Sequence, residues 1–374
     1  MHTQADTTVR GEEIVGRRIE ELPTPTLLLD LAALRRNVDA MAEWARDVVD
    51  VRPHAKIHKC VEIALLQQAA GSIGSTTATV WEAAPLVRAG VREVLIANEV
   101  VGADKLALLA QLAGEGSLIV AVDDLQTVDL LSQAAAAAGT EVGVLVDIDV
   151  GMGRGGVRSE DEARAVAGRA AAAPGVAVRG VMGYEGHAVL ERDRDRRRAL
   201  VEEAMEKLLH HAELLRGDGH EIAIVSAGGT NTHDLTGPIE GVTELQAGTY
   251  VLMDTAYTFY APRFEPALSV AGRVVSRHGG RVVLDCGSKT VGVPELEQPR
   301  PRTSALAFKA LHEEHALLDV VEGSGPSLGD VVELVVGYCG GAVNSHDAYV
   351  VVEDGVAVDV WPIVGRGPGR VPSR

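Results

Sequence analysis

The chain has 374 residues, and 46% of them are hydrophobic, so it is long enough for one large barrel or two domains with a substantial core. Its 53 acidic residues outnumber its 35 lysines and arginines, which gives a formal net charge of −18. This charge argues against a nucleic-acid-binding protein and against binding to an anionic membrane surface, because both need a basic face. No apolar run approaches the ~20 residues of a membrane span.

The cysteines and the first residues indicate the cellular setting. Cys60, Cys286 and Cys339 form no Cys-x-x-Cys pair, so we expect neither a disulfide framework nor a thiolate zinc site. The N-terminal residues contain no apolar signal core, and we therefore expect a cytoplasmic protein. Residues 1–22 are polar and predict a flexible arm.

Short apolar strands alternate with helices up to about residue 250. Leu27–Asp30 predicts a buried strand, and Leu31–Val49 predicts a helix because apolar residues recur at helical spacing without Pro or Gly. Eight further strands are predicted at Val49–Ala55, Ser75–Val80, Glu93–Asn98, Ser117–Val122, Gly143–Asp149, Ala177–Tyr184, Ile222–Ser226 and Thr243–Ala247. Ala- and Leu-rich segments between them end in Gly, which is a helix stop. We predict a (β/α)8 TIM-type barrel over residues 23–254, with an open doubly wound sheet as the alternative.

After Met253 the pattern changes. Runs of β-branched residues are joined by Gly-Gly and Asp-Gly turns, and helical spacing largely disappears. This predicts a mostly antiparallel β domain over residues 255–374. The strand near residues 24–30 could pack with this domain, and the proline-rich segment 294–302 predicts a loop inside it.

Two histidines and two lysines crowd the end of the first barrel strand, where TIM barrels place their active sites. Strand alternation would direct His54, Lys56 and His58 to one face and Lys59 to the other. A lysine in a partly apolar barrel mouth has a lowered pKa and becomes an amine nucleophile, as a Schiff-base cofactor requires. The alternative is a solvated basic strand end. His54 and His58 would lie about 13 Å apart on a strand, which argues against a shared metal ion.

The fifth and sixth strands end in residues suited to a planar ligand. Gly151, Gly153 and Gly156 match the dinucleotide pattern GxGxxG, but the acidic residue expected about 20 positions later is missing. We therefore expect these glycines to let the backbone approach another planar ligand, with Arg154 pointing at it. Tyr184 stands between glycines and is equally consistent with a ligand contact and with a packed core side chain.

The ends of the seventh and eighth strands carry small and hydroxyl-bearing residues. These are Gly228, Gly229 and Thr230, and then Gly248, Thr249 and Tyr250. Backbone amides in such segments bind anions, and TIM barrels often hold a phosphate after these two strands. Two ordinary glycine turns are the alternative. A lysine, an arginine, a tyrosine and a phosphate cradle together suit pyridoxal 5′-phosphate (PLP).

These segments resemble a known family. TPTLLLD (24–30), RPHAKIHK (52–59), DIDVGMGRGGV (147–157) and TELQAGTYVLMD (243–254) are similar to the D-threonine aldolase and D-serine dehydratase family. The resemblance covers essentially the whole chain, and RPHxKxHK is a specific block. It implies PLP enzymes of the alanine racemase fold type, usually homodimers. It also implies Lys56 as the Schiff-base lysine, Arg154 and Tyr184 at the ring, and segments 228–230 and 248–250 at the phosphate.

The chain departs from the family pattern at a divalent metal. The family binds the metal through a His-x-Asp or His-x-Cys pair, and the matching positions here are Tyr338 and Gly340. Glycine offers no ligand, neutral tyrosine is a weak one, and strand alternation directs Cys339 the other way. We therefore expect no metal at this pair, and our hypothesis is that Tyr338 replaces it as an acid–base group or hydroxyl contact. The family's histidine after the ring tyrosine is matched by Leu190, with His187 nearby.

The sequence therefore predicts a PLP-dependent lyase, either an aldolase or a dehydratase, that acts on a β-hydroxy-D-amino acid. A metal-independent racemase or epimerase is the alternative, because PLP still acidifies the α-carbon without a metal. A non-catalytic PLP-binding protein fits less well, since such carriers are typically a bare barrel, and a degenerate barrel serving as a binding module fits least. The expected partners are a small amino-acid substrate and a second copy of the chain, with no nucleic acid and no membrane.

Overall fold

The computed structural model describes residues 11–293 and 297–366. The chain divides into two compact units. Unit 1 comprises residues 1–37 and 251–363, and unit 2 comprises residues 38–250 and 364–374. Of the three boundaries, one falls within helix α2 (Leu31–Ala45), one within the short 3-10 helix η3 (Thr249–Val251) and one after Ile363. Within the described ranges, none of the helices combines the length and the apolar character that a membrane span requires.

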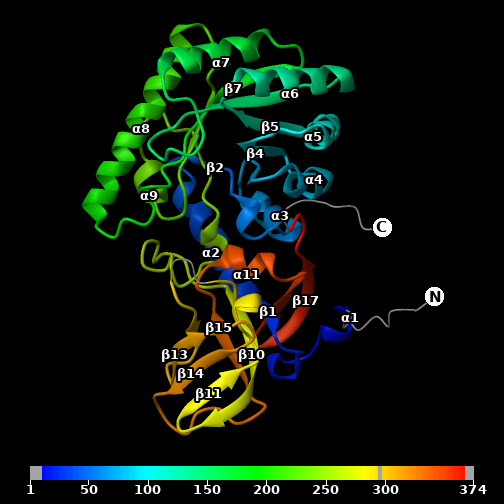
Figure 1. Ribbon diagram of the computed structural model, residues 1–374, viewed down its shortest axis with the longest axis vertical. Helices are drawn as coiled ribbons and strands as arrows, with labels where there is room; N and C mark the ends of the chain where they lie inside the picture. The colour runs from blue at the N-terminus through cyan, green and yellow to red at the C-terminus, as the bar shows by residue number, and fades with distance from the viewer. Residues whose placement is uncertain (1–10, 294–296, 367–374) are drawn as a thin grey trace, which may run out of the picture. The chain divides into compact units, whose positions relative to one another are not determined.

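Within the described residues, unit 2 contains a parallel sheet of eight strands (Figure 1). The strands are β2 (Asp50–Val51), β3 (Ser75–Thr77), β4 (Glu93–Glu99), β5 (Ser117–Val122), β6 (Val142–Asp147), β7 (Val176–Met182), β8 (Ile224–Ala227) and β9 (Glu244–Leu245). Their order is β2-β9-β8-β7-β6-β5-β4-β3, and a bridge between His54 and Thr76 joins the two edges. The predicted (β/α)8 barrel is confirmed, and the open doubly wound sheet is wrong because the sheet curls back onto itself.

The helices of unit 2 follow its strands along the chain and surround them on their outer face (Figure 1). They are α3 (Val61–Ala69), α4 (Val80–Arg88), α5 (Ala103–Glu115), α6 (Leu125–Ala138), α7 (Glu160–Ala172), α8 (Arg194–Gly217) and α9 (His233–Thr236). Thr79, Asp124, Ser159 and Asp193 precede four of these helices and accept a hydrogen bond from an amide of the first turn. Such capping fixes where each helix begins.

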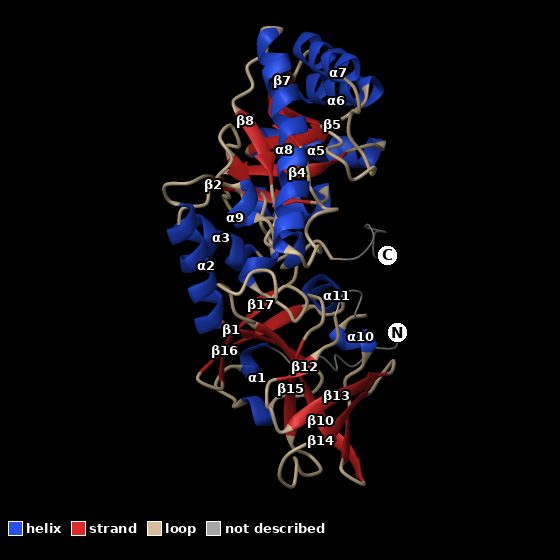
Figure 2. Cartoon of the chain, turned by 90° about the vertical axis from the view of Figure 1, so that its left-hand side faces the viewer, coloured by secondary structure: helices blue, strands red, loops and turns tan. Residues whose placement is uncertain are grey.

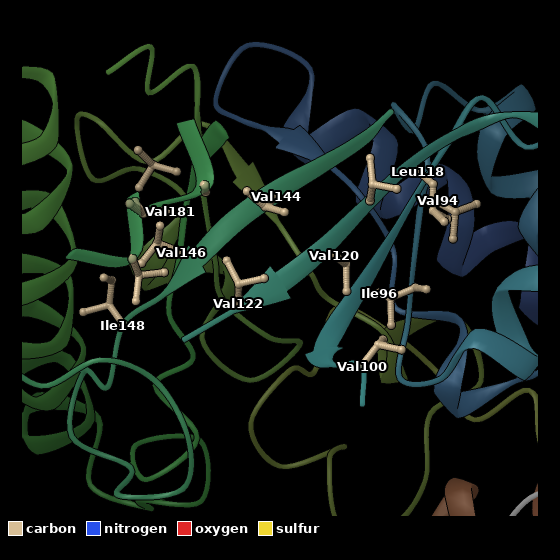
Figure 3. Close-up of a cluster of buried hydrophobic side chains, with 14 of the residues drawn as sticks. Val94, Ile96, Val100, Leu118, Val120, Val122, Val144, Val146, Ile148 and Val181 are labelled. Atoms are coloured by element: carbon tan, nitrogen blue, oxygen red, sulfur yellow. The ribbon is translucent and has the colours of Figure 1, made fainter. Parts of the chain in front are cut away.

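Alternate side chains of the barrel strands face opposite sides of the sheet. One set, which includes Val94, Ile96, Val120 and Val144, packs with helix side chains in a large buried cluster (Figure 3). The side chains between them form a second buried cluster, on the inner face: Leu95, Ile119, Ala121, Leu145, Met182 and Ile224. β-Branched residues suit these pleated surfaces, which explains how a chain with only 3% aromatic residues builds a dense core.

Unit 1 is built on a mostly antiparallel sheet, which has nine strands among the described residues (Figure 2). The strands are β1 (Thr26–Asp30), β10 (Leu268–His278), β11 (Arg281–Leu284), β12 (Arg300–Pro301), β13 (Leu306–Leu311), β14 (Ala316–Val320), β15 (Val331–Val335), β16 (Ala348–Glu353) and β17 (Val356–Pro362). The short helices are α1 (Gly11–Ile14), η1 (Ile19–Glu21), α10 (Ser288–Val291) and α11 (Cys339–Asn344). The predicted antiparallel β domain is confirmed.

Several local features differ from the sequence-based expectations. Residues up to 37 group with unit 1, because β1 pairs with both β10 and β16 of that sheet. Of the expected arm, residues 1–10 lie outside the described residues, while residues 11–22 contain α1 and η1. Of the expected loop 294–302, residues 294–296 lie outside the described residues, and Arg300–Pro301 form β12. The first long helix ends at Ala45, four residues before the expected end at Val49.

Candidate active site

Lys56 lies in a 3-10 turn, η2 (Ala55–Ile57), after the carboxyl end of β2. The expected strand alternation is therefore wrong here, because His54 and His58 are buried while Lys56 remains exposed to solvent. The amide of Lys56 donates to Nδ1 of His54 (3.5 Å), and the amide of Cys60 donates to Nδ1 of His58 (3.1 Å). Burial lowers the pKa of His58 to about 3 and that of His54 well below its usual range. Both rings are thus neutral and shape the turn.

The Lys56 amine lies in a partly desolvated environment. Its nitrogen is 5.9 Å from the centroid of the Tyr184 ring. Protein atoms surround the amine on most sides, although part of the side chain reaches water. The loss of bulk water lowers the pKa of Lys56, and the positive charge of Arg154 lowers it further. Because of this lowered pKa, a larger fraction of the Lys56 amine is neutral at a given pH, and the neutral amine is the nucleophilic form.

The contacts of Lys59 stabilise the turn after β2. Its backbone adopts a φ of 48°, which is uncommon for a residue other than glycine. Its ammonium group lies 2.5 Å from Glu82, which is buried, and 3.3 Å from the carbonyl oxygen of Gly365. The amide of Val364 donates to the Lys59 carbonyl (2.7 Å), so the segment after β17 holds this turn in place.

The Tyr184 ring packs against two glycines. A Cβ on Gly186 would lie 2.6 Å from Cε1 of the ring, and one on Gly229 would lie 3.5 Å from Cε2. A larger residue at position 186 would clash with the Tyr184 ring, so glycine is needed there. The other edge of the ring lies against the segment that follows β8. The structure thus brings Lys56, Tyr184 and the first predicted phosphate segment together, although they lie far apart in the sequence.

A hydrogen bond joins the two predicted phosphate segments, from the amide of Tyr250 to Oγ1 of Thr230 (3.0 Å). The Tyr250 side chain is buried, and its hydroxyl accepts a hydrogen bond from Gln67 (2.9 Å). The amides of Thr230, Gly248 and Thr249 have no acceptor among the residues that the structure describes. Within the two segments, these three amides remain for an anion.

A buried carboxylate that sequence reasoning missed organises the first of these segments. Glu185 is fully buried and accepts hydrogen bonds from the amide of Gly228 (3.1 Å), Oγ1 of Thr232 (2.7 Å) and Oγ1 of Thr236 (2.6 Å). The amide of Gly229 in turn donates to Oγ1 of Thr232 (3.1 Å). The amides of Gly228 and Gly229 therefore shape the segment instead of pointing to a ligand.

The glycine-rich loop after β6 is stabilised by its own carboxylate. Asp149 accepts hydrogen bonds from the amides of Gly151 (3.1 Å) and Gly153 (2.9 Å), whose φ angles of 131° and 66° favour glycine. A Cβ on Gly151 would lie 3.1 Å from the His187 ring, so this glycine also admits a close approach. The loop presents Arg154, which is exposed, on the side of Lys56.

Three carboxyl groups surround the backbone of this loop. A Cβ on Gly155 would lie 3.7 Å from the carboxyl oxygens of Glu99 and Asp123 and 3.8 Å from that of Asp147. Burial, followed by the charge of Glu99, raises the pKa of Asp147 to about 8, while Arg154 acts in the opposite direction. Asp147 is therefore mostly protonated at neutral pH. The sequence does contain a signal for this group, since the three acids stand at the ends of successive strands.

Tyr338 belongs to unit 1, where it precedes helix α11. Cys339 is the first residue of that helix and is fully buried, so helix geometry rather than strand alternation determines where it points. Burial raises the pKa of its thiol well above the usual range. Within the described ranges, no three or more His, Cys, Asp or Glu side chains are grouped so that they could hold a metal ion.

The residues at the carboxyl ends of the barrel strands fit PLP by three observations. Lys56 has a lowered pKa and lies beside an aromatic ring. Arg154 adds a positive charge on the same side. In the part of the chain that the structure describes, the amides of Thr230, Gly248 and Thr249 after β8 and β9 have no acceptor, at the rim where TIM barrels often hold a phosphate.

Comparisons with known proteins decide the family. Residues 29–256 match the family described as "Alanine racemase, N-terminal domain", and residues 267–352 match that described as "Putative serine dehydratase domain". The chain is 39% identical to a D-threonine aldolase of Arthrobacter sp. over 95% of this chain and 96% of that protein. The chain belongs to the D-threonine aldolase and D-serine dehydratase family.

Other members of this family agree in sequence and in structure. A 3-hydroxy-D-aspartate aldolase of Paracoccus denitrificans (strain Pd 1222) is 33% identical over 95% of each chain. The crystal structure of a D-threonine aldolase from Filomicrobium marinum superposes with a TM-score of 0.89 at 35% identity, over 93% of this chain and 97% of that one. The resemblance stated from the sequence is thus confirmed, and PLP is the cofactor expected for this family.

Proposed function

We propose that this chain is a PLP-dependent lyase, an aldolase or a dehydratase, that acts on a β-hydroxy-D-amino acid. The observation that carries the proposal is the environment of Lys56 in a member of this family. Its amine has a lowered pKa, faces the Tyr184 ring and lies within the field of Arg154. A side chain placed in this way suits covalent binding of an aldehyde cofactor.

The proposed assignments follow the barrel rim. Lys56 would bind the cofactor aldehyde, and Arg154 and Tyr184 would hold its ring. The amides of Thr230, Gly248 and Thr249 would hold the phosphate, while Gly228, Gly229 and Tyr250 shape the cradle around it. When bound, PLP supplies an electron-withdrawing ring that weakens the bonds to the substrate's α-carbon.

Lys56 is also the proposed proton carrier at the α-carbon. A lowered pKa allows its amine to accept a proton at neutral pH and to return it. Tyr338 is the proposed group that holds or donates a proton at the β-hydroxyl oxygen.

A homodimer and a cytoplasmic setting, which the sequence led us to expect, stay predictions. Sedimentation velocity measures the oligomeric state.

Product analysis tests the proposal. The protein, reconstituted with PLP, is incubated with D-threonine, D-serine and 3-hydroxy-D-aspartate. An aldolase yields glycine and an aldehyde, whereas a dehydratase yields a 2-oxo acid and ammonia. We expect one of these product pairs, loss of turnover in Lys56→Ala, and full turnover in the control Lys105→Ala, whose lysine is exposed on α5.

Two other outcomes would contradict the proposal. Inversion of the substrate with solvent deuterium at the α-carbon, without cleavage, would identify a racemase or epimerase. PLP bound at Lys56 with no turnover of any substrate would identify a non-catalytic PLP-binding protein.

A further inference from the structure

Tyr338 and Gly340 pack directly against each other at the start of helix α11. A Cβ on Gly340 would lie 3.0 Å from Cε1, from Cζ and from the hydroxyl oxygen of Tyr338. The phenol ring thus folds back over residue 340 and fills the space in which any side chain there would begin. A side chain at position 340 would require the ring to move by a few tenths of an ångström, so the conformations of the two positions depend on each other.

The neighbouring side chains that could bind a metal have other partners. The thiol of Cys339 donates to the carbonyl oxygen of Met253 (3.3 Å), and the Cys339 amide donates to the carboxylate of Asp254 (2.9 Å). Cys339 and Asp254 are both fully buried. Nε2 of His346 pairs with the carbonyl oxygen of Thr290 (2.8 Å). These groups hold the start of α11 in place.

A divalent metal does not fit the residues at this position. A neutral phenol is a poor ligand for a divalent metal ion, and glycine supplies no side-chain donor. The chain therefore disagrees here with the metal pair that the family resemblance implies. The disagreement concerns both positions of the pair, and the structure shows that they are packed as one arrangement.

We propose that Tyr338 and Gly340 form a coupled pair that replaces the divalent metal, with the Tyr338 hydroxyl serving the substrate's β-hydroxyl group. The proposal rests on the lyase function proposed above. Gly340 acts as a positioning residue, because its missing side chain leaves room for the folded phenol. The hydroxyl then contributes a hydrogen-bond donor and acceptor where the family pattern has two metal ligands.

Metal binding provides the first test and does not depend on turnover. The PLP-loaded protein is dialysed against chelator and then titrated calorimetrically with Mn²⁺ and with Zn²⁺. We expect no stoichiometric binding of either ion and unchanged activity before and after chelation. Binding of one equivalent, together with activity that falls on chelation and returns with the metal, would overturn the proposal.

Two neighbouring glycines provide a matched pair of variants. Gly340→Ala places a Cβ 3.0 Å from the phenol, whereas Gly341→Ala places one 3.5 Å from Gly292 and 4.0 Å from the Tyr338 ring. Both glycines lie in α11, so the change in helix propensity is the same. We expect Gly340→Ala and Tyr338→Phe each to lower kcat at least about tenfold, with cofactor absorbance and melting temperature retained. Gly341→Ala should keep the wild-type kcat.

The double variant tests whether the two positions are coupled. Tyr338→Phe combined with Gly340→Ala should be no slower than Tyr338→Phe alone, because the displaced ring no longer carries the hydroxyl. Three results would each overturn the proposal. They are equal kcat values in Gly340→Ala and Gly341→Ala, a wild-type kcat in Tyr338→Phe, and additive losses of kcat in the double variant.

The same experiments separate this proposal from the proposed function. If no lyase turnover is found but metal still fails to bind, the proposed function is wrong and the metal-free site stands. If lyase turnover is found but requires bound metal, the proposed function stands and the coupled pair is wrong.

Discussion

The amine of Lys56 lies 5.9 Å from the centre of the Tyr184 ring, within the range of a cation–π contact. Lys56 follows β2 and Tyr184 follows β7, and β9 and β8 stand between these strands in the sheet. The two side chains meet because parallel strands of a barrel all end at the same rim. The ring favours the charged amine, whereas partial desolvation and the charge of Arg154 favour the neutral amine. The pKa of Lys56 is lowered, so the second pair of effects is the larger.

Removal of the Arg154 charge should raise the pKa of Lys56. In Arg154→Met, the ammonium form of Lys56 no longer faces a neighbouring cation, so the midpoint of its titration should move to higher pH. Competitive acetylation of the apoprotein across a pH series, with the Lys56 peptide quantified by mass spectrometry, measures this midpoint. Arg158→Met is the matched control, because Arg158 lies in the same loop and pairs with Asp149 (3.3 Å). Equal midpoints in the two variants would refute the assignment.

Asp147 should make the protein less stable as the pH rises. Its pKa of about 8 in the folded state exceeds the ordinary value of 3.8, so the folded protein holds a proton that the unfolded chain has released. The stabilisation is fully present below pH ~4 and is lost as the pH rises through about 8, with a slope of at most about 1.4 kcal/mol per pH unit. Urea unfolding of the wild type and of Asp147→Asn should show a steeper fall in the wild type over this window. Parallel curves would contradict the raised pKa.

Glu185 should determine the affinity for the phosphate of the cofactor. In Glu185→Gln, the side-chain amide turns a donor toward hydroxyl and amide groups that need an acceptor, so the segment after β8 loses its geometry. We expect PLP to bind about tenfold more weakly, which is about 1.4 kcal/mol, while pyridoxal, which lacks the phosphate, binds as before. Equilibrium dialysis of the apoprotein measures both affinities. The control Glu240→Gln, at an exposed position, should change neither.

Arg52 should stabilise the barrel through a buried ion pair. Its guanidinium lies 2.9 Å from Glu244 and 3.1 Å from Glu93, and Arg52 and Glu244 are each only 2% exposed. Arg52→Met leaves a carboxylate buried without its cation, and the free energy of unfolding should fall by about 3–5 kcal/mol. The exposed pair of Arg36 and Glu265 offers a comparison, and Arg36→Met should shift the urea midpoint far less. Similar shifts would show that burial of the pair does not matter.

Much of the fold could be predicted because the signals are local. Short stretches of chain carry the strand and helix periods and the glycines that end helices. They also carry the change after Met253 to β-branched runs joined by glycine turns. The eight barrel strands lie where these patterns place them, although β2, β3 and β9 are shorter than expected. Lys56 was predicted as the cofactor lysine from its residue type and position, which stays a prediction, whereas the strand geometry expected for it was wrong. The chain leaves the extended conformation at Ala55, and alternation no longer applies to a 3-10 turn.

The parts of the site that could not be predicted depend on residues far apart in the chain. Glu185 receives its hydrogen bonds from residues 43 to 51 positions later, and no local pattern indicates which acid will be enclosed in this way. The raised pKa of Asp147 needs three strand ends to be brought around one glycine loop. In each case the effect comes from desolvation, which exists only after packing.

The sequence by itself determined the barrel, the antiparallel β domain and the family, because hydrophobic period and short motifs act over a few residues. The tertiary structure alone decided which amides after β8 and β9 lack an acceptor among the described residues, which carboxyls hold a proton and how Tyr338 packs on Gly340. Those outcomes depend on distances of a few ångströms between separate elements and on the water that packing removes. Both arise only when the elements pack together, so local sequence patterns cannot predict them.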